Sequence, residues 1–493
     1  MALTGRAGLL AALAAIVVLL APEPGLVVLA AALVLTALVT ADLLLAGGVR
    51  GLRFHRDGDR RVRLGQSLVI GLVVDNPGPR RLRGVLRDAW QPSAGAAPRR
   101  QALDVPPGER RRLVTTLTPV RRGDREAVAV TVRSVGPLGL AARQRTFEAP
   151  WTVRVLPPFL SRRHLPARLA RLRELDGRHP ALVRGQGTEF DSLREYVVGD
   201  DVRSIDWRAS ARRSDVVVRT WRPERDRRVL IVLDTGRTSA GRIGTAPPGF
   251  GPGFGPGFAP DSGADSGAPG SEADAGPGPG RGPETRSGPG PARGPGAGSG
   301  AGSGAAGWPR LDWSMDAALL LAALAARAGD RVDFLAYDRA VRAQVSGASR
   351  TELLSSMVNA MAPIEAELVE SDAAGMAAAV LSRARRRCLV VLLTDLNTAA
   401  MEEGLLPVLP RLSARHLVLV AAVADPRVAE MAAGRGTAEA VYDAAAAERL
   451  RGERREVTAT LRRQGVEVVD ALPEDIAPAL ADAYLALKAA GRL

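Results

Sequence analysis

A chain of 493 residues is too long for one compact domain and predicts two to four folded units. The net charge is +14 and is carried almost entirely by arginine, since Lys488 is the only lysine. The arginines are scattered among 53 acidic residues and aromatic residues make up only 4% of the chain, which argues against a nucleic-acid-binding protein that stacks bases. Cys388 is the single cysteine, so no intramolecular disulfide is possible, and its place beside an apolar run predicts a small buried core residue.

Two apolar runs occupy the first 50 residues. Residues 7–21 carry no charge, and residues 26–45 are interrupted only by two threonines and Asp42. A membrane-spanning helix needs about 20 apolar residues, a length that the second run meets and the first approaches only if Arg6 snorkels to the interface. A cleavable signal peptide is the alternative, but a second apolar run follows the first with no polar mature sequence between them. We therefore predict a transmembrane hairpin of two helices over residues 1–50.

Positive charge flanks this hairpin at both ends and predicts its orientation in the cell membrane. Arg6 precedes the first run, and five arginines follow the second: Arg50, Arg53, Arg56, Arg60 and Arg61. Arginine close to a span marks the cytoplasmic side, so we expect a tight outer turn at residues 22–25 and cytoplasmic soluble domains. Asp42 lies near the inner end, where its carboxylate reaches the membrane interface.

Residues 51–157 have the pattern of a small β-sandwich-like domain. Residues 67–74 are rich in β-forming side chains and end at an Asp-Asn-Pro-Gly turn signal. Residues 111–117, 127–132 and 151–155 have the same strand character. Short strands between Pro and Gly turns are typical of a sandwich of about 100 residues.

Residues 226–493 show a different pattern, in which apolar strands alternate with helices. Strands are predicted at 228–234, 331–337, 389–395, 416–423 and 465–469, and helices at 311–327 and 371–386. Continuous apolar strands that alternate with helices predict an α/β, doubly wound parallel sheet. Such sheets bind ligands at the carboxyl ends of their strands, where Asp234 and Asp395 are expected.

A stretch of low complexity interrupts this α/β domain. Residues 245–307 consist mainly of Gly, Pro, Ala and Ser, with a repeated Pro-Gly-Phe-Gly pattern near the start. This composition cannot bury a core, so we predict a disordered insertion that acts as a spacer. A long insertion is tolerated because the entropy of loop closure grows only logarithmically with length.

The segment that links the two domains, residues 158–225, contains a long signature. Residues 185–213 read GQGTEFDSLREYVVGDDVRSIDWRASARR. This closely resembles the signature of the domain-of-unknown-function 58 family, bacterial membrane-anchored proteins with a von Willebrand factor A-like domain. Arg121-Arg122-Gly123 and residues 137–140 resemble family landmarks of the β domain as well, although Gly136 stands where the family usually has an Asp.

The signature mixes acids, arginines and aromatic residues, and three interpretations remain open. The first is a docking segment that buries its aromatic residues, Trp207 among them, in the core and holds the two domains together. The second is a partner-binding surface. The third, acid–base catalysis by paired carboxylates, lacks a nucleophile, a phosphate loop and a histidine partner. The residues concerned are Glu189, Phe190, Arg194, Tyr196, Asp200, Asp201, Arg203, Asp206, Trp207, Arg208 and Arg212.

The family resemblance also implies a metal site. Domains of the von Willebrand type hold a divalent cation through Asp-x-Ser-x-Ser, a distant Thr and a distant Asp, and hard cations prefer such oxygen ligands. Here Asp234 and Thr238 fit the first element, but Gly236 replaces a hydroxyl ligand. Ser371 stands for the Thr and Asp395 for the distant Asp. Mg²⁺ or another divalent cation is the candidate ligand, and a vestigial site whose acids cap helices or pair with arginines is the alternative.

The resemblance also sets the functional expectation. Members of this family are often encoded near MoxR-type AAA+ ATPases, which implies a non-enzymatic membrane adaptor or assembly factor that works with such an ATPase. A docking platform for cell-envelope or secretion components is the second hypothesis. A metal-dependent hydrolase is the third.

Overall fold

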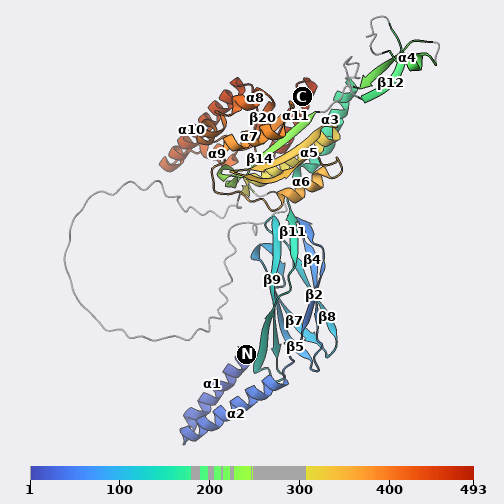
Figure 1. The fold of residues 1–493 in the computed structure, drawn as a ribbon. Coiled ribbons are helices and arrows are strands. Elements are labelled where there is room, and N and C mark those ends of the chain that lie inside the picture. The colour runs from blue at the N-terminus through green and yellow to red at the C-terminus, as the bar shows by residue number, and fades with distance from the viewer. Residues whose placement is uncertain are drawn as a thin grey trace.

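The computed structural model describes residues 2–178, 189–197, 205–212, 215–222, 227–245, 247 and 307–493. Nearly all of the predicted insertion at 245–307 lies outside the described residues. Figure 1 shows an elongated molecule, with the N-terminal helices at one end, a domain of β-strands in the middle, and a layered domain of helices and strands beyond it. The mixed class predicted from the sequence, with several sheets and an N-terminal apolar helix, is therefore confirmed.

Two helices follow the short strand β1 (Ala2–Leu3) at the N-terminus. Helix α1 (Gly5–Leu20) contacts helix α2 (Pro24–Leu45), and Pro24 takes the first turn of α2, where its missing N–H costs no hydrogen bond. Among the described residues, only α2 is long and apolar enough to cross a membrane, and 6% of its apolar window is buried. The sixteen residues of α1 are fewer than a span needs. A second span and the orientation of the pair thus stay predictions.

The middle domain consists of two packed sheets. One has the order β1-β10-β9-β11-β3, with β5 and β7 joined to it through β9, and the other has the order β2-β4-β8-β6. Alternate side chains such as Leu72, Val74, Leu86 and Val130 point into the shared core, which is the expected consequence of a strand period of two. The strands are β2 (Arg53–Gly58), β3 (Arg61–Arg63), β4 (Leu68–Asp75), β5 (Leu82–Trp90), β6 (Ala96–Ala97), β7 (Arg100–Val105), β8 (Arg110–Leu117), β9 (Gly123–Val135), β10 (Ala141–Phe147) and β11 (Thr152–Leu156).

The third part contains a six-stranded sheet in the order β18-β17-β14-β19-β20-β21. All neighbours pair in parallel except β18, which runs antiparallel to β17 at one edge. The strands are β14 (Arg228–Asp234), β17 (Arg331–Tyr337), β18 (Val341–Val345), β19 (Leu389–Leu393), β20 (Leu417–Val423) and β21 (Glu467–Ala471). The apolar runs of β14, β17, β19 and β20 are buried on both faces, as a parallel sheet requires, whereas the edge strands β18 and β21 are partly exposed.

Helices cover both faces of this sheet. On one face α5 (Arg310–Arg327) contacts β14 and packs beside α11 (Ile476–Ala489), which contacts β20 and β21, and α6 (Leu353–Met361) also packs on α5. On the other face, α7 (Ala373–Arg383) and α8 (Leu409–Ser413) pack with α10 (Ala438–Arg463), which follows α9 (Pro426–Ala432). The helix predicted at 371–386 is shorter than expected at both ends. It begins after Asp372, which caps it by accepting the N–H of Gly375 at 2.9 Å, and it ends at Arg383. Cys388 is buried in this layer, as predicted, and burial raises the pKa of its thiol to about 11.

A buried ion pair joins the middle domain to the sheet domain. The guanidinium of Arg122, in the turn between β8 and β9, donates through Nε to Asp312 of α5. Both side chains are 7% exposed, and the second oxygen of Asp312 accepts the indole N–H of Trp308 at 2.9 Å. The landmark turn at Arg122 is therefore an interdomain contact.

The signature segment forms a hairpin at the far end of the molecule. Helix α3 (Leu165–Arg178), preceded by the short turn η2 (Leu160–His164), leads from the middle domain past α5. Strands β12 (Glu189–Glu195) and β13 (Val217–Arg222) then pair antiparallel, with the single turn α4 (Trp207–Ser210) packed on β13. In Figure 1 this hairpin projects beyond α3, away from the six-stranded sheet.

Candidate functional site

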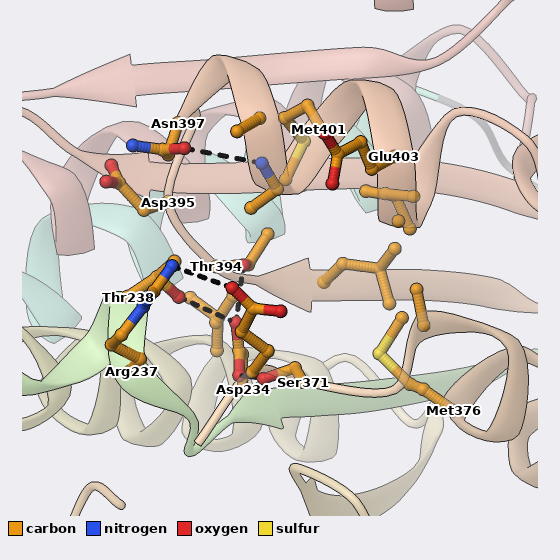
Figure 2. Close-up of a pocket in the computed structure, with 18 of the residues that line it drawn as sticks. Asp234, Arg237, Thr238, Ser371, Met376, Thr394, Asp395, Asn397, Met401 and Glu403 are labelled. Atoms are coloured by element: carbon orange, nitrogen blue, oxygen red, sulfur yellow. Dashed lines mark hydrogen bonds and ion pairs between the residues drawn. The ribbon is translucent and has the colours of Figure 1, made fainter. Parts of the chain in front are cut away.

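Asp234 is the centre of a hydrogen-bond cluster at the carboxyl end of β14. Asp234 is 7% exposed, and its two carboxylate oxygens accept four hydrogen bonds. Oδ1 accepts the N–H of Gly236 at 2.9 Å and the hydroxyl of Ser371 at 2.5 Å. Oδ2 accepts the hydroxyls of Thr238 at 3.0 Å and Thr394 at 2.7 Å. Figure 2 shows these side chains converging on the carboxylate.

Three separate elements bring these groups together. Thr238 lies in the short turn η4 (Arg237–Ala240) directly after β14, Ser371 precedes α7, and Thr394 follows β19. The carboxyl ends of parallel strands meet at one edge of a sheet, so β14 and β19 deliver Asp234 and Thr394 side by side. Asp234, Thr238 and Ser371 were predicted to meet, whereas Thr394 was missed although it adjoins the predicted Asp395.

Gly236 supplies no hydroxyl ligand, but its lack of a side chain matters for the packing of the site. A Cβ atom at this position would collide with Ser371 Oγ and would lie 2.9 Å from the carbonyl oxygen of Val369. The same carbonyl accepts the N–H of Arg237 at 2.8 Å, which holds the two loops in close approach. The glycine therefore lets the loop that carries Ser371 reach Asp234.

Asp395 lies near this cluster but is neutralised by arginines. Its Oδ2 accepts Arg310 Nη1 at 2.9 Å and its Oδ1 accepts Arg454 Nη1 at 2.8 Å. Arg454 also pairs with Asp470, and Arg310 Nη1 lies 2.7 Å from the carbonyl oxygen of Thr238. Burial disfavours the charged form of Arg454, yet its hydrogen bonds and the charges of Asp470 and Asp395 outweigh that effect and raise its pKa. Arg310, Arg454 and Asp470 were missed by sequence reasoning because they are distant in the chain.

Two hollows flank these residues. A cleft of about 530 Å³ opens beside Asp234, between the end of β19, the start of α7 and the turn η6 (Ala400–Leu405). Met376 and Met401 add apolar side chains to its lining, and Glu403 and Asn397 add polar ones. In Figure 2 Met401 lies beside Glu403, and Met376 lies apart from both. A wider groove of about 1200 Å³ continues past Asp395 along α10.

The donor set fits a divalent cation only in part. Asp234, Thr238, Ser371 and Thr394 offer oxygen ligands of the right kind, but Asp234 is the only acid among them. Asp395, the expected second acid, is held by two guanidinium groups. Within the described residues, no group of three or more His, Cys, Asp or Glu side chains is placed to hold a metal ion.

Trp207 of the signature is not a core residue, so that prediction is wrong. Its side chain is 66% exposed on α4, whereas the core of the sheet domain is filled by α5 and α11. Asp206 caps α4 by accepting the N–H groups of Arg208 at 3.1 Å and Ala209 at 3.0 Å. The domains are joined instead by the buried pair of Arg122 and Asp312 and by an apolar cluster that contains residues of both domains, such as Leu64 and Leu311.

The other signature residues are distributed as follows. Arg208 and Arg212 are exposed on and beside α4, and Tyr196 is half-buried, with its N–H donated to the carbonyl of Val216 at 2.8 Å. The structure describes only the backbone of Glu189, Phe190 and Arg194, which lies in β12. Asp200, Asp201 and Arg203 lie outside the described residues.

Comparison with known proteins supports the family resemblance over part of the chain. The sequence model described as "Protein of unknown function DUF58" matches residues 192–246 and 302–471, somewhat less than half of the chain. The match begins inside the signature, and its interruption falls within the predicted insertion. The uncharacterized protein YeaD of Bacillus subtilis (strain 168) is 27% identical over 124 residues, which are 24% of this chain and 29% of that protein.

Two solved structures share limited likeness with the chain. The CARDB domain of the PF1109 protein from Pyrococcus furiosus is 16% identical over 21% of this chain and 91% of its own, with a TM-score of 0.17. A beta-glucosidase from Listeria innocua is 14% identical over 21% of this chain and 16% of its own, with a TM-score of 0.15. At these scores neither likeness bears on fold or function.

Proposed function

We propose that this chain is a membrane-anchored adaptor that binds a protein partner through the signature hairpin, and that the partner is a MoxR-type AAA+ ATPase. The observation that carries the proposal is the exposure of Trp207, 66%, in a segment matched by the family model. An exposed indole forgoes the favourable free energy of burying its apolar surface, and a partner that covers it recovers that free energy. Tryptophan is also the residue most enriched among binding hot spots. Helix α4, which carries Trp207, lies at the projecting end of the molecule (Figure 1), where it is accessible to a large partner.

The neighbours of Trp207 suit a protein interface. Arg208 and Arg212 are exposed beside it, and arginine is the other side chain enriched with tryptophan at hot spots. Val197 and Val216, 57% and 41% exposed, add apolar surface at the ends of the hairpin strands. A central aromatic residue with charged neighbours matches the anatomy of a protein–protein contact.

The membrane anchor and the sheet domain have separate roles in this proposal. Helix α2 holds the chain in the membrane, with the soluble parts in the cytoplasm. The sheet domain is von Willebrand factor A-like, a reading supported by its parallel strand order and by Asp234 at the end of β14 with hydroxyls around it. It has no catalytic role of its own, and a divalent cation at Asp234 would be held weakly, since Asp395 is already paired.

The test is a binding assay with the full chain in detergent or nanodiscs and a purified MoxR-type AAA+ ATPase from the same organism. Trp207→Ala should weaken binding about thirtyfold or more, the scale of a hot spot worth about 2 kcal/mol. Because Trp207 is exposed, the melting temperature should not change measurably. Tyr442→Ala is the matched control, since Tyr442 is an aromatic residue, 78% exposed, on α10.

Two results would contradict the proposal. Wild-type affinity in the Trp207→Ala variant would show that the hairpin is not part of the interface. Equal losses of affinity in the Trp207→Ala and Tyr442→Ala variants would show a nonspecific apolar effect. A pair Arg208→Ala/Arg212→Ala separates the contribution of charge from that of the indole, because it leaves Trp207 in place.

A further inference from the structure

The N-terminal helices are fixed to the middle domain by a carboxylate in α2. Asp42 is fully buried, and its oxygens accept the backbone N–H groups of Leu138 at 2.7 Å, Leu140 at 2.7 Å and Ala141 at 2.8 Å. These amides belong to the turn between β9 and β10 and to the first residue of β10, so the last turn of α2 is held against one end of the domain. The expectation that Asp42 only reaches the membrane interface is corrected by these bonds.

A glycine in the same turn leaves room for this carboxylate. A Cβ atom at Gly136, the position where the family resemblance expects an Asp, would collide with Asp42. The glycine therefore lets the carboxylate of Asp42 approach the turn. Strand β1 adds a second attachment, because Ala2 pairs with Ala142 and extends the sheet at β10. The hydrogen bonds of Asp42 and the pairing of β1 with β10 both hold this end of the domain next to the helices.

Four arginines surround the junction, and we call them the arginine collar: Arg6, Arg80, Arg133 and Arg143. Arg143 Nε donates to the carbonyl of Leu43 at 3.0 Å, Arg133 Nη2 donates to the carbonyl of Leu3 at 3.0 Å, and Arg80 donates to the carbonyl of Leu44. Arg6 Nη1 lies 2.9 Å from the point where a Cβ of Gly139 would stand, so it sits over the same turn.

The collar carries positive charge that the described residues do not neutralise. Within the part of the chain that the structure describes, no ion pair joins any of the four arginines to a carboxylate. Asp42 is buried and is used by backbone amides, and the nearby Asp104 pairs with Arg81 and Arg83. A guanidinium has five N–H donors, so one bond to a carbonyl leaves donors for a phosphate.

Exposed leucines lie at the same level as the collar. Leu44 and Leu45, at the end of α2, are 60% and 55% exposed, and Leu3 is 67% exposed. Leu138, at the tip of the turn held by Asp42, is 46% exposed. Apolar side chains beside arginines at the end of a spanning helix are the arrangement of a membrane interface, where hydrocarbon gives way to head groups.

We propose that this end of the middle domain, formed by the collar and the turn at residues 136–140, binds directly to the surface of a bilayer that contains anionic phospholipids. The arginines contact lipid phosphates and Leu138 enters the head-group boundary. This inference rests on the membrane anchoring in the proposed function, and it adds that the anchor is a rigid mount that sets the direction in which the domain leaves the membrane.

The test uses the full chain in vesicles of phosphatidylcholine with and without phosphatidylglycerol. Spin-labelled phosphatidylglycerol and spin-labelled phosphatidylcholine report, by electron spin resonance, which lipid the protein immobilises. One arginine beside an anionic surface changes association roughly fivefold. We therefore expect the wild type to prefer the anionic lipid, and Arg80→Gln/Arg143→Gln to lose most of that preference at the sites it contacts. The preference should also decline at high salt.

The control removes the same charge further from the helices. Arg87 and Arg100 face each other in β5 and β7, are exposed, and lie about five strand residues, roughly 17 Å, beyond the membrane-side end of β5 at Leu82. Arg87→Gln/Arg100→Gln should keep the wild-type preference. If Arg80→Gln/Arg143→Gln does not fold, Arg6→Gln/Arg133→Gln and the salt dependence of the wild type give the same readout.

The possible outcomes separate this inference from the anchoring on which it rests. Release of the chain from membranes by alkaline carbonate would refute the anchor itself. A chain that stays inserted but shows no preference for phosphatidylglycerol, or one whose control loses the preference equally, would refute the collar alone.

Discussion

Replacement of Asp312 by alanine should destabilise the chain more than any exposed ion pair does. Asp312 is 8% exposed, and its carboxylate accepts Arg122 from the middle domain and the indole N–H of Trp308 at 2.9 Å. Its loss leaves the buried guanidinium of Arg122 without a counter-ion. The remaining hydrogen-bond acceptor of Arg122 is the neutral carbonyl of Met361, which lies at 3.4 Å and does not replace the lost charge. Breaking a buried pair from one side costs about 3–5 kcal/mol, since the partner stays desolvated and unpaired.

A double replacement distinguishes this cause from loss of packing alone. In Arg122→Met/Asp312→Leu neither charge remains buried, so the free energy of unfolding should fall by less than the sum of the two single replacements. The exposed pair of Arg154 and Asp124, at 2.8 Å in the same domain, is the matched control. Its side chains are 40% and 34% exposed, and Asp124→Ala should cost about 0–1 kcal/mol.

Urea unfolding of the full chain in detergent, followed by tryptophan fluorescence and far-ultraviolet circular dichroism, measures these differences. Each part of the chain contributes its own transition, so each variant is compared with the wild type at the transition of the domain that carries the replacement, the middle domain for Asp124 and the sheet domain for Asp312. Equal costs for Asp312→Ala and Asp124→Ala, or strictly additive effects of the Arg122 and Asp312 replacements, would refute the argument from burial.

Four further predictions concern single features. Gly236→Ser should collide with Ser371 and lower the free energy of unfolding by about 1–3 kcal/mol, and it should not strengthen Mg²⁺ binding. Adding Ser371→Gly should relieve the collision; urea unfolding measures the stability and calorimetric titration measures the Mg²⁺ binding. Deletion of residues 248–306 should change the free energy of unfolding by about 1 kcal/mol or less, since β15 (Arg242–Ile243) and β16 (Trp308–Pro309) already pair at its base, and a cooperative loss of structure would contradict this. Burial raises the pKa of Asp316 to about 6, above the ordinary 3.8, so the folded chain holds the extra proton and the free energy of unfolding should fall as pH rises from about 4 to 6, a slope that Asp316→Asn should remove. A reporter that is active only outside the cytoplasm, fused after Leu493, should stay silent, and strong activity from an inserted fusion would reverse the predicted orientation.

Local patterns were sufficient for the long apolar elements of the fold, whereas shorter or more polar ones such as β18 and α6 were not predicted. The apolar runs at 228–234 and 389–393 became β14 and β19, and the run at 26–45 became most of α2, because burial on a strand or a helix face leaves a short-range periodicity in the sequence. Asp234 could be placed at a sheet edge for the same reason, since an acid directly after an apolar strand must lie at that strand's end. The composition of residues 245–307 likewise marked an insertion, and the family match is interrupted within it.

The partners of the polar side chains were decided only by the tertiary structure. Asp395 meets Arg310 and Arg454 from distant helices, and Asp42 meets a turn almost a hundred residues later in the chain. The large apolar side chain of Trp207 predicted a core residue, yet the hairpin that carries it lies away from the core and leaves the indole in solvent. A hydrogen bond or an ion pair depends on distances of a few ångströms between groups far apart in sequence, and no local period records which groups the packing of helices and strands will bring that close.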